Sequence, residues 1–122
     1  MVKILVIDDS VFERRVIVSL LKKNGYNNIA EADNGVDGIR KYCIEEPDLV
    51  ILDLKIPNMD GLDTIERLKE IDSNARIIAA SIIRNRATIE DCIRRGAEAY
   101  IEKPITEAKL IPQVKELICD KD

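Results

Sequence analysis

The sequence contains no histidine and no tryptophan, and its 122 residues include only one phenylalanine and three tyrosines. Without histidine, the chain has no imidazole for general base catalysis, for metal binding or for carrying a phosphoryl group. Four aromatic rings are too few for a surface on which nucleic acid bases stack. These absences exclude several common kinds of enzyme and of nucleic-acid-binding protein.

Cysteine and long hydrophobic runs are also scarce. The three cysteines are far apart and form no C-x-x-C pair, which argues against a zinc site or a redox motif and indicates packing or surface residues in a reducing cytoplasm. The longest nearly pure apolar stretch, Ile77 to Ile83, is far shorter than the roughly 18 residues that span a bilayer. Because Met1 leads directly into a strand-like segment, we expect no secretory signal and a cytoplasmic protein.

The charge of the chain is slightly acidic. It has 19 Lys and Arg residues against 23 Asp and Glu residues, a net charge of −4 at pH 7. With no run of Lys or Arg, the sequence predicts no direct binding to nucleic acid, and no membrane association is expected either. A hydrophobic fraction of 46% is ample for a core, and the length suits one domain over residues 1–122.

Short apolar runs alternate with amphipathic segments along the whole chain. We expect strands at residues 2–7, 28–32, 48–53, 75–81 and 99–102, and helices at 11–24, 35–46, 61–71, 87–95 and 106–118. Runs such as ILVI and LVIL are apolar at each position, which is typical of strands that are buried on both faces of a parallel sheet. With right-handed crossovers, the prediction is a three-layer, doubly wound (βα)5 fold of the α/β class.

Polar residues follow four of the expected strands at the point where each strand ends. Asp8 and Asp9 come after the first strand, Asp53 ends the third, Ser81 ends the fourth and Lys103 follows the fifth. Taken singly, each is explained as a turn, cap or loop residue. Ligands of open α/β sheets bind beyond the carboxyl ends of the strands, so we expect these side chains to form one site.

The residue types of this predicted site indicate a particular chemistry. Three carboxylates within about 6 Å repel one another unless a cation lies among them. A cluster of oxygen ligands without histidine or cysteine favours a hard ion, and Mg²⁺ fits because it needs only one or two carboxylates and keeps its waters. The Lys103 ammonium and the Ser81 hydroxyl add groups that suit a dianion, so the site is typical of phosphoryl transfer to a carboxylate.

Several segments together resemble the receiver domains of response regulators in two-component signalling, including those of chemotaxis regulators. They are ILVIDDS (4–10), ADNGVDGI (32–39), PDLVILDLKIPNMDG (47–61) and GAEAYIEKP (96–104), with Ser81 after IIAA. The resemblance covers residues 3 to about 118 and implies a flavodoxin-like sheet of strand order 2-1-3-4-5. It also implies a signalling switch and not an enzyme, with no output domain in this chain.

The resemblance assigns roles at the metal and phosphorylation site. Asp53 would accept a phosphoryl group from a partner histidine kinase. Asp8, Asp9, Asp53 and the backbone carbonyl of Lys55 would bind Mg²⁺, with Mn²⁺ as a substitute. Asp9 would be a direct ligand, and Asp8 would bind through water.

The resemblance also assigns a conformational switch. Ser81 and Lys103 would hold the phosphoryl oxygens, and Tyr100 would turn inward when Ser81 moves. The Lys103–Pro104 peptide would be cis. The face made by the fourth helix, the fifth strand and the fifth helix would then change and bind a downstream protein, or act on an output domain beyond this chain.

Three residues depart from the pattern of the family. Ile82 stands where a small residue is usual, so we expect it to flank the mouth of the site together with Lys55 and to slow loss of the phosphoryl group. Gly38 replaces a helix former and is expected to cost about 1 kcal/mol. Pro112 is expected to kink the last helix or to shift its start.

Two other functions use similar residues. A Mg²⁺-dependent phosphohydrolase with an aspartyl nucleophile has similar chemistry, but such enzymes typically carry D-x-D after the first strand and a cap insertion, whereas this chain has adjacent Asp8 and Asp9. A flavin or nucleotide carrier on the same fold needs a Gly-, Ser- or Thr-rich phosphate loop, and the acidic segment IDDSVFERR has the wrong sign of charge.

Overall fold

The computed structural model describes residues 1–56 and 58–119, and five strands of this part form one parallel sheet of order β2-β1-β3-β4-β5. The strands are β1 (Lys3–Ile7), β2 (Asn28–Ala32), β3 (Leu49–Asp53), β4 (Ile77–Ser81) and β5 (Ala99–Glu102). The helices are α1 (Val11–Lys23), α2 (Gly35–Glu45), α3 (Gly61–Ile71), α4 (Arg86–Arg95) and α5 (Glu107–Ile118). The predicted α/β class, alternation and flavodoxin-like strand order are confirmed.

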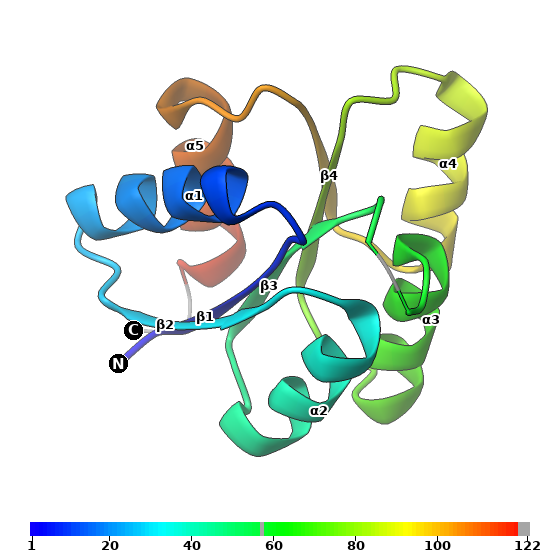
Figure 1. The fold of residues 1–122 in the computed structure, drawn as a ribbon, viewed down its shortest axis with the longest axis horizontal. Coiled ribbons are helices and arrows are strands. Elements are labelled where there is room, and N and C mark those ends of the chain that lie inside the picture. The colour runs from blue at the N-terminus through cyan, green and yellow to red at the C-terminus, as the bar shows by residue number, and fades with distance from the viewer. Residues whose placement is uncertain (57, 120–122) are drawn as a thin grey trace.

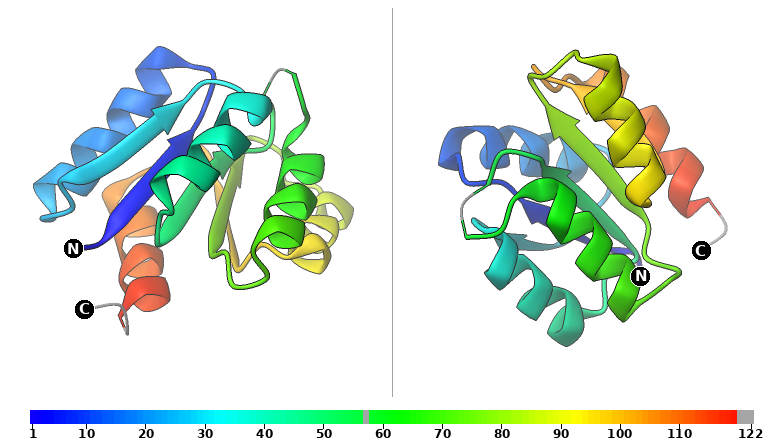
Figure 2. Two further views of the ribbon diagram at one scale, coloured as in Figure 1. Left: turned by 90° about the horizontal axis from the view of Figure 1, so that it is seen from below. Right: turned by 90° about the vertical axis from the view of Figure 1, so that its right-hand side faces the viewer.

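The sheet is the middle of three layers, with α1 and α5 on one face and α2, α3 and α4 on the other (Figures 1 and 2). Successive residues of each central strand alternate between these layers. In β1, Leu5 and Ile7 pack into the cluster under α2 and α3, whereas Ile4 and Val6 pack into the cluster under α1 and α5. All four side chains are fully buried, which explains why the run ILVI contains no polar residue.

Side-chain caps define where the helices begin. The Ser10 hydroxyl accepts a hydrogen bond from the backbone N–H of Glu13, so Ser10 caps α1. Thr106 caps α5 in the same way, through the backbone N–H of Lys109. Pro112 lies inside α5, which nevertheless starts directly after its cap, so the expected shift of its start is not found.

Gly38 is explained by the packing of α2 on the sheet. A Cβ atom added at this position would lie 2.5 Å from Cδ1 and 3.0 Å from Cγ1 of Ile7, a fully buried side chain of β1. The absent side chain lets the helix approach the strand closely. This close packing offsets the expected cost of about 1 kcal/mol in helix propensity.

The cysteines and the lengths of the helices are two further features of the fold. The three cysteines are free, with Cys92 on the buried side of α4 and Cys43 and Cys119 exposed. Burial raises the pKa of the Cys92 thiol to about 11, which keeps it protonated at neutral pH. Within the described residues, none of the helices has the length and apolar character needed to cross a membrane.

Candidate functional site

The carboxyl ends of the central strands bring the predicted site residues together. Asp8, Asp53, Ser81 and Lys103 are buried, with exposed fractions between 1% and 8%, whereas Asp9 is exposed. A cavity of about 190 Å³ opens beside them, lined by Asp9, Glu13, Asp53, Lys55, Ser81, Ile82 and Lys103. The polar residues predicted at the ends of the strands therefore lie together beside a cavity in the structure.

Lys103 is the central cation of this site. Its Nζ lies 3.1 Å from Oδ2 of Asp53 and 3.2 Å from Oδ2 of Asp8, and both contacts are buried. A third carboxylate, that of Glu13 on α1, lies 2.7 Å from the same Nζ. Sequence reasoning missed Glu13, because it treated α1 as an amphipathic helix and did not follow the direction of its first-turn side chains.

Burial and charge act in opposite directions on the two central groups. Burial raises the pKa of the Asp53 carboxyl, while the backbone N–H of Lys55 and the ammonium of Lys103 oppose the rise. Burial alone would lower the pKa of Lys103, but the hydrogen bond to Glu13 and the charges of Asp53 and Asp8 leave it above its ordinary value. Lys103 is therefore a permanent cation at neutral pH.

The acidic residues of the site have the composition of a divalent cation site. Asp8, Asp9 and Asp53 each offer a carboxylate oxygen, and these atoms all lie within 4.8 Å of one another. Oxygen-only ligands fit Mg²⁺ and disfavour soft ions. The backbone carbonyl of Lys55 as a further ligand stays a prediction.

Asp9 differs from its two acidic neighbours because none of the described ion pairs or hydrogen bonds involves its side chain. Its charge repels theirs without a compensating contact, so we expect Asp9→Asn to raise the Tm of the metal-free protein by about 2–5 °C. The same change should weaken Mg²⁺ binding at least tenfold. Thermal unfolding in chelator and a Mg²⁺ titration measure the two effects.

Glu116→Gln on α5 is the control, since it removes one exposed charge far from the carboxyl ends of the strands. A lower Tm for Asp9→Asn together with unchanged Mg²⁺ affinity would contradict the clustering of the three carboxylates.

Ser81 and Tyr100 meet at the backbone of one residue, Ile83. The Ser81 Oγ accepts a hydrogen bond from the N–H of Ile83 at 3.1 Å, and the Tyr100 hydroxyl donates to the carbonyl of Ile83. The half-buried ring of Tyr100 packs against the cluster under α2 and α3, and burial raises the pKa of its hydroxyl. The Lys103–Pro104 peptide is cis, as expected.

The two residues expected at the rim lie there. The side chain of Ile82 is 67% exposed, and Ile82 and Lys55 line the same cavity as Asp53. They also line a neighbouring hollow of about 290 Å³ that is lined in addition by Leu54, Leu62 and Thr88. A molecule that enters the site from solvent therefore passes a bulky apolar side chain and a cationic one.

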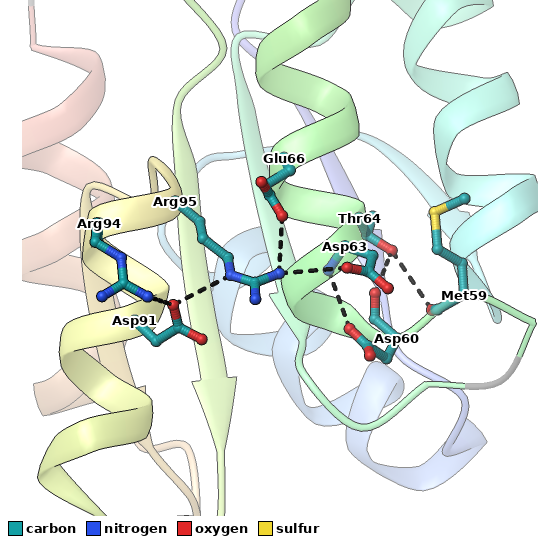
Figure 3. Close-up of polar contacts among 8 residues, drawn as sticks. All are labelled: Met59, Asp60, Asp63, Thr64, Glu66, Asp91, Arg94 and Arg95. Atoms are coloured by element: carbon teal, nitrogen blue, oxygen red, sulfur yellow. Dashed lines mark hydrogen bonds and ion pairs between the residues drawn. The ribbon is translucent and has the colours of Figure 1, made fainter.

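Ion pairs connect the helices next to the site, as Figure 3 shows. Arg95 of α4 contacts Glu66 at 2.8 Å and Asp63 at 3.3 Å, both on α3, and Asp91 on its own helix. Asp60 caps α3 by accepting the backbone N–H of Asp63 at 3.0 Å. These contacts join α4 to α3, the helix that begins after the loop that follows Asp53.

Comparison with known proteins agrees with the geometry. Residues 4–115 match the response regulator receiver domain, and the chain belongs to this family. It is therefore a phosphorylation-activated signalling switch of two-component systems, as predicted from its motifs.

Among curated relatives, the chain is 36% identical to the chemotaxis protein CheY of Bacillus subtilis over 116 residues, which are 95% of this chain and 97% of that protein. It is 34% identical to sporulation initiation phosphotransferase F of the same organism, over 95% of this chain and 93% of that protein. A solved structure of a CheX-CheY-BeF3-Mg²⁺ complex from Borrelia burgdorferi contains a similar chain, with a TM-score of 0.92, 32% identity and coverage of 96% of this chain and 89% of that one.

Proposed function

We propose that Asp53 accepts a phosphoryl group from a phosphohistidine of a partner kinase, at a divalent cation site made by Asp8, Asp9 and Asp53. The observation that carries this proposal is the position of the Lys103 ammonium between the buried carboxylates of Asp53 and Asp8, beside a third carboxylate and an open cavity. A carboxylate held beside fixed positive charge is suited to bind and accept a dianionic group.

Three residues of this chain have different roles in the transfer of the phosphoryl group. An Asp53 oxygen forms the new bond to phosphorus, and the donor nitrogen leaves with the electron pair of the old bond. Lys103 and the Ser81 hydroxyl donate hydrogen bonds to the phosphoryl oxygens. The three carboxylates and the Lys55 carbonyl would hold Mg²⁺, or Mn²⁺ in its place, and the ion would supply positive charge to the same oxygens.

The proposal includes an output. When the Ser81 hydroxyl moves to the phosphoryl group, its hydrogen bond with the Ile83 N–H is lost, and the loop that holds the Tyr100 hydroxyl is free to move. The face of α4, β5 and α5 then changes and binds a downstream protein in the cytoplasm, or acts on an output domain beyond this chain. Both forms of output fit the geometry.

An apolar surface of this chain next to Asp53 is suited to bind the partner kinase. Phe12 and Val11 of α1 are 75% and 52% exposed, and Phe12 lines a hollow of about 440 Å³ together with Val16, Pro104 and Ile105. This apolar surface borders the cavity over Asp53, because Glu13 lines both. This surface supports a protein as the donor, since a small phosphodonor is too small to contact it while its phosphoryl group lies at Asp53.

Incubation with acetyl phosphate and Mg²⁺ separates the proposed switch from the alternative phosphohydrolase. The switch accumulates one acyl phosphate, which borohydride reduction and peptide mass spectrometry locate at Asp53. A phosphohydrolase instead releases phosphate continuously and retains little. In the described part of the chain α1 follows β1 almost at once, so no cap domain lies between them, which favours the switch.

We expect a long lifetime of the phosphorylated state because of the side chain of Ile82 at the rim of the cavity. The attacking water has to approach in line with the bond to Asp53, and the stiff side chain of Ile82 stands at the mouth of the cavity. We expect Ile82→Ala to hydrolyse about threefold to tenfold faster at matched Mg²⁺, and to be phosphorylated faster by small donors. Loss of label from purified phosphoprotein measures the rate.

Ile93→Ala is the matched control, because Ile93 is an exposed isoleucine on α4 that does not line the cavity. If Ile82→Ala and wild type lose phosphate at equal rates, Ile82 acts only as rim packing.

A further inference from the structure

Glu13 is the nearest ion-pair partner of Lys103. Its Oε1 lies 2.7 Å from Nζ, against 3.1 Å and 3.2 Å for the carboxylates of Asp53 and Asp8. Its side chain is 43% exposed, whereas those of Asp53 and Asp8 are 7% and 1% exposed. Glu13 therefore contacts the ammonium from the solvent side of the cavity that it helps to line.

This position is not explained by helix capping. Ser10 and Glu13 match the capping box S-x-x-E, in which the glutamate side chain accepts the backbone N–H of the serine. Only half of the box forms, because the Ser10 hydroxyl accepts the Glu13 N–H while the Ser10 N–H donates to Oδ1 of Asp8 at 2.9 Å. Asp8 thus satisfies the donor that Glu13 would otherwise bind, and the Glu13 carboxylate contacts Lys103.

Two consequences follow for a group that enters the site. Three carboxylates contact the ammonium of Lys103, so a phosphoryl oxygen that approaches it has to share its positive charge with them. Asp53 loses its negative charge when it becomes an acyl phosphate, but Glu13 keeps its own. An incoming anion therefore competes with Glu13 for Lys103 and meets its negative charge at the mouth.

We propose that Glu13 is a specificity-determining residue that disfavours small dianionic phosphodonors, of which acyl phosphates are the chemical class, at the mouth of the Asp53 site. The inference rests on the proposed function of Asp53. Glu13 neutralises part of the positive charge of Lys103 and repels the donor in proportion to the donor's charge. The chain is thereby protected from free acyl phosphates and depends more on a protein donor that brings its own binding surface.

Two small donors isolate the effect of charge. Acetyl phosphate is a dianion near neutral pH, and its P–O bond breaks as an Asp53 oxygen bonds to phosphorus, so that acetate leaves with the electron pair. Phosphoramidate carries the same phosphoryl group on a smaller leaving group and has a single net negative charge, because its nitrogen is protonated, and it releases ammonia when the P–N bond breaks. The ratio of their phosphorylation rates reports the charge at the mouth and cancels general changes in reactivity.

The experiment uses the whole chain with saturating Mg²⁺ and compares wild type with Glu13→Gln, which keeps a hydrogen bond acceptor for Lys103 and removes the charge. We expect the ratio of the rate with acetyl phosphate to the rate with phosphoramidate to rise about threefold to tenfold. Because salt screens an exposed charge, the rise should shrink at high ionic strength. Glu13→Ala should shift the ratio in the same direction.

Glu70→Gln is the control. Glu70 pairs with Arg67 on the exposed surface of α3, so this substitution removes one unit of negative charge far from the Asp53 site. Its ratio should equal that of wild type. An unchanged or lower ratio in Glu13→Gln, with Asp53 phosphorylated in wild type, overturns the role of Glu13 alone. If Asp53 of wild type takes up no phosphate from either donor, the proposed function itself fails.

Discussion

We expect Asp53→Asn to take up no measurable phosphate from acetyl phosphate or from a kinase, although it folds normally. The asparagine amide has the same shape but does not offer the carboxylate oxygen that bonds to phosphorus. Burial raises the pKa of the Asp53 carboxyl, so the fold tolerates a neutral group there, and Lys103 keeps its contacts with Glu13 and Asp8. Intact-protein mass spectrometry and thermal unfolding measure the two outcomes.

Asp60→Asn is the matched control for this experiment. Asp60 lies in the same β3–α3 connection, but its side chain caps α3, a role that asparagine also fills. Asp60→Asn should therefore be phosphorylated like wild type. Phosphate on another residue of wild type, or retention of phosphate in Asp53→Asn, would show that Asp53 is not the acceptor.

Lys103→Met is expected to cause the largest loss of stability at the site. It removes the cation that contacts two buried carboxylates, and breaking a buried pair from one side leaves uncompensated charge. We expect the free energy of unfolding of the metal-free protein to fall by about 2–4 kcal/mol, near the lower end of that range because the cavity admits solvent. Urea unfolding in chelator measures the change.

The loss of folding stability in Lys103→Met should change with pH in one direction. The folded-state pKa of Asp53 is raised by burial, and loss of the ammonium raises it further, so the folded state binds more protons than the unfolded state. The deficit in stability should therefore shrink as the pH falls from about 7 to about 5. Adding Asp53→Asn to Lys103→Met should recover part of the loss at neutral pH.

Lys23→Met serves as the control, since the ion pair of Lys23 with Glu107 is largely exposed and should contribute little. A deficit in Lys103→Met that is equal to that of Lys23→Met, or that grows as the pH falls, would contradict the assigned charge balance.

The sequence predicted those features that depend on the order of residues along one element. Strand burial follows from apolar runs such as ILVI, and the place of Asp53 and Ser81 follows from their position at the ends of β3 and β4. The first and last residues of the helices and strands were predicted less accurately, because side-chain caps and turn contacts determine where each element begins and ends. Asp48, for example, was expected in a strand, but it lies before β3 and accepts the backbone N–H of Lys3 through its carboxylate.

The features that sequence did not predict depend on contacts between elements. Glu13 was not singled out from the sequence, because its contact with Lys103 joins the first turn of α1 to a residue that follows β5. Gly38 looked like a defect, because its close approach to Ile7 involves a strand some thirty residues earlier in the chain. A pattern within one segment carries no information about either contact.

The paired hydrogen bonds at Ile83 have a consequence for how receiver domains with this loop vary. The side chains of Ser81 and Tyr100 reach the N–H and the carbonyl of the same residue, so Ile83 itself takes part in the connection between the buried site and the outer face through main-chain atoms alone. The side chain at this position, 38% exposed here, is therefore free to change without loss of the connection. A partner surface can thus evolve new contacts at the very residue through which the signal passes.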